Sequence, residues 1–129
     1  MADAELDFSE LLPIGDEIED RARKVAEGAY PLVKEYALKL QKRWRENARD
    51  TAPPHGKHYP RSITAEQIFN ASAAEWEVGP DSALPQGGMG RGFEYGSRNQ
   101  PPHLDGAQAT VAVEPEFNAA VDKLVEKLL

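Results

Sequence analysis

The sequence predicts an α+β domain in which helices pack on a small antiparallel sheet. A run from Ile14 to about Arg49 repeats apolar residues at steps of three and four, which is typical of a helix. Shorter stretches in the middle of the chain alternate apolar and polar residues, as strands do. A second apolar helical stripe follows Pro115. The length of 129 residues suits one domain. We expect that domain at 14–129, behind an acidic N-terminal arm at 1–13.

The charges along the first helix agree with its direction. Acids stand in its first turns and bases in its last turns, and both favour the helix dipole. Gly28 and Pro31 interrupt the middle, so we expect a kink near Pro31. One long bent helix is preferred to two helices, because the apolar stripe continues in phase. The acids are Asp16, Glu17, Glu19 and Asp20, and the bases are Lys42, Arg43, Arg45 and Arg49.

The middle of the chain predicts strands separated by loops. Residues 51–62 hold three prolines and a glycine, which indicates an irregular loop, and residues 81–91 indicate a second flexible loop. Between them, SITAEQIF from Ser62 and AEWEVGP at 74–80 are predicted strands. A short third strand is expected at 92–96. Together they predict an antiparallel sheet of about three to four strands.

Side-chain alternation places particular residues on the two faces of these strands. Trp76 and Val78 should share one face, with Glu75 and Glu77 on the other. A hairpin turn is expected at 70–72.

The end of the chain predicts a final helix. Pro115 suits its first turn, where the missing backbone donor is not needed. Its apolar stripe comprises Phe117, Ala120 or Val121, Leu124, Val125 and Leu128. Residues 103–112 fit either a short helix or an extended segment.

Patterns typical of catalysis or cofactor binding are absent from the sequence. The glycines at 87–92 precede a predicted strand and no lysine follows, so neither the P-loop nor the dinucleotide spacing is met. His55 and His58 lie three residues apart, but no cysteine exists to complete a structural zinc site. No GxSxG motif appears. We therefore predict no catalytic residue, no cofactor and no metal site. A small hydrolase using His55 or His58 remains an alternative.

The charge is unevenly distributed along the chain. The formal net charge is −7, with an acidic stretch at 1–20, a basic stretch at 21–61 and an acidic remainder. Such asymmetry favours charge-complementary contacts within the fold or between copies, although a solvated basic helix face explains it equally well. No run of about 18 apolar residues predicts a membrane span, and the acidic start is unlike a secretory signal.

The basic stretch also allows a nucleic-acid-binding module. Residues 21–61 contain Tyr30, Tyr36, Trp44 and Tyr59 among the cations. These aromatics fall largely on the apolar stripe, which indicates core, and the net charge opposes general DNA affinity.

Three segments resemble a known family. The first segment comes after the long predicted helix and reads ARDTAPPHGKHYPRSI. The second comes later in the chain and reads AEWEVGP. The third precedes the last predicted helix and reads GFEYGSRNQPPHL. Together they resemble the head–tail joining or tail-completion (neck) proteins of long-tailed bacteriophages, which include minor tail protein Z of phage lambda. The resemblance covers roughly residues 14–129. The chain departs from the commonest pattern at 55–58, where the family usually has an Asp-Thr-Gly-like turn, and at 103–104, where an aromatic-Leu pair is more usual.

The resemblance implies a structural virion protein without catalysis. The family forms a ring, of six copies as the expected number, at the junction of head and tail, and is assembled in the host cytoplasm. Its expected partners are further copies, adjacent connector or stopper proteins and the tail tube protein, and genomic DNA passes through without sequence-specific binding. A tail terminator capping the tail tube is an alternative role.

The same resemblance and the charge pattern suggest residues for the contacts between copies. Phe93 and Tyr95 should anchor one face of the third strand, and Glu94 should face an edge or a partner. Gly96 should permit a tight turn. The interface residues that we expect are Arg43, Arg49, Arg91, Phe93, Glu94, Tyr95 and Arg98.

Overall fold

The computed structural model describes residues 11–71 and 73–128 and confirms an α+β fold. Most of the predicted acidic arm at 1–13 lies outside the described residues, and its last three residues belong to the first helix. The elements in chain order are α1 (Leu11–Thr51), η1 (Pro54–Gly56), α2 (Tyr59–Ser62), β1 (Ile63–Ile68), β2 (Glu75–Pro80), η2 (Gly87–Met89), α3 (Gly90–Tyr95) and α4 (Asp105–Leu128).

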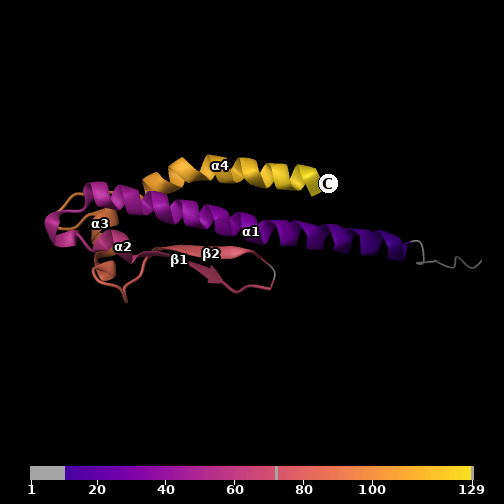
Figure 1. The fold of residues 1–129 in the computed structure, drawn as a ribbon, viewed down its shortest axis with the longest axis horizontal. Helices are drawn as coiled ribbons and strands as arrows, with labels where there is room; N and C mark the ends of the chain where they lie inside the picture. The colour runs from indigo at the N-terminus through magenta and orange to yellow at the C-terminus, as the bar shows by residue number, and fades with distance from the viewer. Residues whose placement is uncertain (1–10, 72, 129) are drawn as a thin grey trace, which may run out of the picture.

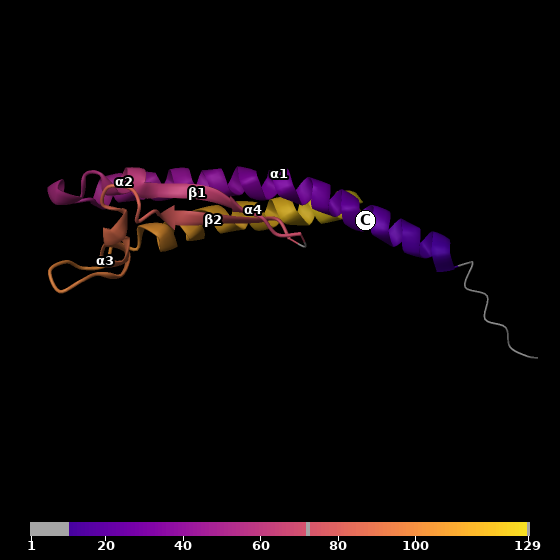
Figure 2. The ribbon, with the colours of Figure 1, turned by 90° about the horizontal axis from the view of Figure 1, so that it is seen from below.

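The long first helix is confirmed as a single element. α1 has 41 residues and continues through Pro31 without interruption. Proline cannot donate the backbone hydrogen bond at this position, and its ring crowds the preceding turn. Figure 2 shows that α1 curves toward its N-terminal end. The apolar stripe therefore stays in phase across the proline, as the preference for one long bent helix requires.

The last helix begins earlier than predicted. α4 starts at Asp105, and Pro115 lies inside it, so the prediction that Pro115 occupies the first turn was wrong. Pro115 cannot bond the carbonyl of Val111, which stands one turn before it. Both residues are exposed, and Val111 retains 73% of its accessible surface, so water can solvate that carbonyl. The helix thus tolerates the proline on its outer face.

The sheet consists of two antiparallel strands. β1 pairs with β2, with Ala65 opposite Val78 and Gln67 opposite Trp76. Trp76 and Val78 are half-buried while Glu75 and Glu77 are exposed, which confirms the predicted alternation. The sheet of three to four strands was wrong, because two strands are found among the described residues.

The predicted third strand is a helix. Residues 92–96 lie in and just after α3, and successive side chains of a helix turn by about 100° rather than alternating. Phe93 and Glu94 can therefore both point inward. Their carbonyls accept hydrogen bonds from His103 (2.8 Å) and Leu104 (3.1 Å) of the following loop, not from another strand. Gly96 has φ +87°, which confirms a turn that glycine favours.

The first loop is more regular than predicted. Residues 51–62 contain the short helices η1 and α2, and each has a proline at its start. A proline at this position loses no helical hydrogen bond, so the prolines begin these turns instead of preventing them. The Ser62 hydroxyl closes α2 by donating a 2.6 Å hydrogen bond to the Tyr59 carbonyl.

The hydrophobic core lies at one end of the molecule. Ala48, Tyr59, Ile63 and Phe93 are almost completely buried, and Trp44 and Val78 pack against them. The Tyr59 and Phe93 rings are 4.6 Å apart between centroids. Figure 1 shows α2 and α3 gathered at the C-terminal end of α1, where this core forms.

α1 lies between the other elements. In Figure 1, α4 runs along one side of α1 and the β-hairpin along the other. The hairpin is fixed to α1 because Gln41 and Arg45 both donate hydrogen bonds to the Ile63 carbonyl, at 3.1 and 2.8 Å. On the opposite side, the Tyr36 and Phe117 rings meet at 5.5 Å. None of the described helices is long and apolar enough to cross a membrane.

α4 is antiparallel to α1 and covers only part of it. The start of α4 meets Trp44 through Gly106, and Leu124 near its end meets Gly28. The first turns of α1 extend beyond the rest of the fold, as both ribbon views show. We refer to residues 14–24 of α1 as the projecting end. All of these residues are exposed except Asp20, which is half-buried.

The close approach at Gly106 predicts a stability defect. A Cβ atom at Gly106 would lie 2.5 Å from Cζ2 of Trp44, so Gly106→Ala should force the indole or α4 to move. We expect a loss of about 1–3 kcal/mol in the free energy of unfolding, measured by chemical denaturation. Gly88→Ala is the matched control, because a Cβ there meets no atom within 4 Å. Equal stability of the two variants would contradict this packing.

Candidate functional site

The Phe93-Glu94-Tyr95 segment has its three side chains in three different environments. Phe93 is fully buried, Glu94 is 8% exposed and Tyr95 is 71% exposed. The Phe93 ring stacks with two histidine rings, at 6.4 Å from His55 and 5.8 Å from His103. The expectation that Phe93 and Tyr95 share a face and that Glu94 points outward was therefore wrong. Of the three, Tyr95 is available to a partner on the surface of this chain.

Glu94 caps the start of α4. Its two carboxylate oxygens accept hydrogen bonds from the backbone nitrogens of Gly106 and Ala107, each at 2.9 Å. The first turn of a helix has donors without helical acceptors, and a negative charge there also favours the helix dipole. A buried carboxylate in this position fixes where α4 begins. No local pattern indicated this role, because Glu94 and Gly106 are 12 residues apart in the sequence.

Asp105 joins α4 to the end of α1. Its carboxylate is 1% exposed and accepts hydrogen bonds from the Thr51 hydroxyl at 2.9 Å. Asn47 donates to the Asp105 carbonyl at 3.0 Å, and His103 Nδ1 lies 4.0 Å from the carboxylate. Burial raises the pKa of Asp105, and the Thr51 hydrogen bond offsets part of this rise. Sequence reasoning did not identify this joint, because its partners are more than 50 residues apart.

The four predicted interface arginines lie on the surface. Arg43 and Arg49 are exposed on α1, Arg91 is exposed on α3, and Arg98 is exposed in the turn that follows. None of them forms an ion pair with another described residue. Arg91 and Tyr95 both belong to α3, one helical turn apart, whereas Arg43 and Arg49 belong to α1 and Arg98 to the turn after α3. Their role between copies remains a prediction.

The histidines are engaged in local packing. His55 and His103 stack on Phe93, and His58 Nδ1 lies 3.4 Å from the Arg61 guanidinium. No three His, Asp or Glu side chains in the described part of the chain are placed to hold a metal ion. Burial raises the pKa of Tyr59 to about 12, so its hydroxyl stays protonated at neutral pH.

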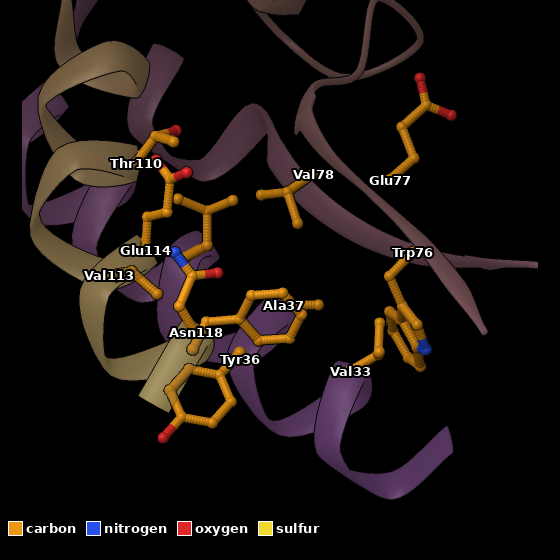
Figure 3. Close-up of a pocket in the computed structure, with 12 residues that line it drawn as sticks. Val33, Tyr36, Ala37, Trp76, Glu77, Val78, Thr110, Val113, Glu114 and Asn118 are labelled. Carbon is orange, nitrogen blue, oxygen red and sulfur yellow. The ribbon is translucent and has the colours of Figure 1, made fainter. Parts of the chain in front are cut away.

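An apolar groove lies between α1, α4 and β2 (Figure 3). It has a volume of about 600 Å³ and is open to solvent. Tyr36 and Val33 come from α1, and Val113 comes from α4 opposite β2. The residues that line the groove are Val33, Tyr36, Ala37, Leu40, Trp76, Glu77, Val78, Thr110, Val113, Glu114, Phe117 and Asn118.

The groove exists because α4 and the hairpin do not meet. Both pack on α1, which forms the floor, and β2 presents Trp76 and Val78 toward the space between them. Few polar atoms converge on this space, and the Glu77 side chain points away from it in Figure 3. An open apolar surface of this kind suits an apolar side chain from another helix better than a small polar substrate. The sequence predicted the apolar faces but not that they would leave a groove.

Comparisons of this chain with protein-family models, with curated proteins and with solved structures found no match. The function must therefore be argued from the geometry and from the sequence resemblance.

Removing the cap should destabilise the fold. Glu94→Ala leaves the Gly106 and Ala107 nitrogens without their acceptor, and Gly106 is buried. We expect a loss of about 1–3 kcal/mol in unfolding free energy. Glu116→Ala, at an exposed position of α4, should change stability by less than about 0.5 kcal/mol. A Glu94→Ala protein as stable as this control would contradict the capping role.

Asp105 should contribute a characteristic pH dependence. Its folded pKa is raised above the ordinary value of 3.8, so the folded state binds its proton more tightly than the unfolded state. The stability due to this group is full below pH 3.8 and is lost as pH rises through the folded pKa. Asp105→Asn should remove this decline, whereas the exposed Asp122→Asn should retain it. Unfolding free energies measured across acidic pH test this, and an unchanged profile in Asp105→Asn would contradict it.

Proposed function

We propose that this chain is a structural protein of a bacteriophage particle, and that it forms a ring at the junction between head and tail. The ring joins the DNA-filled head to the tail tube and leaves a channel for DNA. The chain carries out no catalysis in this role. About six copies are expected, in contact with adjacent connector or stopper proteins and with the tail tube protein.

One structural observation carries the proposal. The chain leaves a long helix end projecting from the fold and an apolar groove unfilled between its elements. On the projecting end, Ile14 and Ile18 retain 52% and 63% of their accessible surface. Exposed apolar surface of this extent on a small domain indicates contacts with other chains. An assembly protein needs such surfaces, whereas an enzyme needs catalytic polar groups positioned together in a pocket.

The sequence resemblance supplies the place of assembly. It depends on the residues of ARDTAPPHGKHYPRSI, AEWEVGP and GFEYGSRNQPPHL. AEWEVGP forms β2, in agreement with the strand that the resemblance implies. GFEYG forms α3 instead of a strand end, so that segment supports the proposal through its residues and not through its conformation. A tail terminator that caps the tail tube is the alternative role within the same class.

A nucleic-acid-binding module is the second candidate. It is favoured by Lys42, Arg43 and Arg49, which are exposed on the C-terminal half of α1 without ion-pair partners among the described residues. Such a module should retard duplex DNA at low salt, with affinity that falls steeply as salt is added. The net charge of −7 opposes this function, and absence of retardation at low salt would exclude it.

The composition of purified particles tests the proposed function. Quantitative mass spectrometry of virions from the source phage should find about six copies of this chain, scaled to the major tail protein. A matched preparation of tails lacking heads, and of heads lacking tails, would show which half carries the ring. Absence of the chain from all three preparations would contradict the proposal.

A further inference from the structure

We propose that copies of this chain assemble by insertion of the projecting end of α1 of one copy into the apolar groove of the next. Ile14 and Ile18 are the inserted side chains, and Val33, Phe117 and Val113 belong to the surface that receives them. This inference rests on the proposed ring and names the contact that builds it.

The projecting end has an apolar stripe with no partner within the described chain. Ile14 and Ile18 are one turn apart, and Ala22 follows after another turn, so the three lie on one face of α1. An isolated helix of this length is marginally stable in water. Here it is continuous with a packed helix but gains no burial of its own. A partner that covers Ile14 and Ile18 would add the burial that this part of α1 lacks.

The groove has the complementary chemistry. Helices commonly bind by placing apolar side chains, spaced by three or four residues, into an apolar groove. A volume of about 600 Å³ can hold several aliphatic side chains. The groove is lined on three sides by α1, β2 and α4, so a helix laid along it would contact all three elements.

Charge is complementary at one edge of this contact. Arg21 flanks the apolar stripe of the projecting end and forms no ion pair with another described residue. Glu114 lines the groove, is exposed, and also lacks an ion-pair partner in the described part of the chain. An arginine beside the inserted isoleucines would therefore meet the Glu114 carboxylate at the edge of the groove, which favours one orientation of the docked helix.

The inserted end has to come from a second copy. The floor of the groove is α1 itself, at Val33, Tyr36 and Leu40, and α1 is one continuous helix from there to the projecting end. The end therefore points away from its own groove. A contact that uses different surfaces on the two partners repeats from copy to copy, and closes into a ring when the rotation permits. This contact is therefore compatible with a ring, and no separate protein is needed to link the copies.

Complementary defective variants test this contact on the full-length protein. Ile18→Asp disables the inserted end and leaves the groove intact, and Val113→Asp does the reverse. Wild-type protein should show a mass that increases with concentration in analytical ultracentrifugation. Each variant alone should associate at least about tenfold more weakly. An equimolar mixture of the two variants should form a one-to-one complex, because the intact projecting end of Val113→Asp can bind the intact groove of Ile18→Asp. Val111→Asp, at an exposed position of α4 outside the groove, should behave as wild type.

A charge exchange tests the contact without changing buried residues. Arg21→Glu should weaken association by about two- to fivefold. Glu114→Arg should restore association, both when the two single variants are mixed and when one chain carries both substitutions. Both positions are exposed, so folding should be unaffected, and circular dichroism verifies this for all variants.

Three results would overturn the contact. They are a wild-type monomer at every concentration, two defective variants that fail to complement, or a Val111→Asp effect equal to that of Val113→Asp. None of these decides the proposed function, which the particle composition tests independently. A chain present at about six copies but without this complementation would form its ring through other surfaces.

Discussion

The arrangement of the whole molecule depends on the joint between the start of α4 and the C-terminal end of α1. Glu94 holds the first backbone nitrogens of α4, and Asp105 binds the Thr51 hydroxyl. Gly106 then allows the Trp44 indole to lie directly against the helix. This joint fixes the position and direction of α4. From there α4 can only run back along α1, as the contact between Tyr36 and Phe117 shows.

Two consequences of that geometry bear on function. Because α4 and the hairpin are anchored at the same end of α1 and lie on different sides of it, the space between them stays open as the apolar groove. Because α4 is shorter than α1, the first turns of α1 are left without cover. The position and length of α4 therefore produce both the groove and the projecting end. We infer that each surface is the partner of the other in a neighbouring copy, which would make the chain a repeating unit of a ring.

Periodicity predicted the elements whose pattern is local. The apolar stripe identified α1 across Pro31, and alternation identified β1 and β2 and the shared face of Trp76 and Val78. The errors arose where tertiary contacts decide the structure. The composition of Phe93-Glu94-Tyr95 is typical of a strand. In the structure Glu94 caps α4 and Phe93 belongs to the core, and both side chains can point inward because the segment is helical. Pro115 is typical of the first turn of a helix, but the Glu94 cap fixes the start of α4 at Asp105.

The candidate surfaces were harder to predict than the fold. Arg43, Arg49, Arg91, Tyr95 and Arg98 are exposed, so they remain open to a role between copies, while Phe93 and Glu94 are buried within the chain. The groove could not be predicted, because it depends on the spacing between α4 and β2, which no local pattern records. The joint at Asp105 was missed for the same reason, since Thr51 and Asp105 are distant in sequence.

Amide hydrogen exchange compared between dilute and assembled protein tests the central claim most directly. The claim is that the projecting end is covered by another copy. It predicts that backbone amides at 14–24 exchange rapidly in the dilute chain and become protected on assembly, together with those at 113–118 along the groove. Assembly that leaves exchange at 14–24 as fast as in the dilute chain would contradict it.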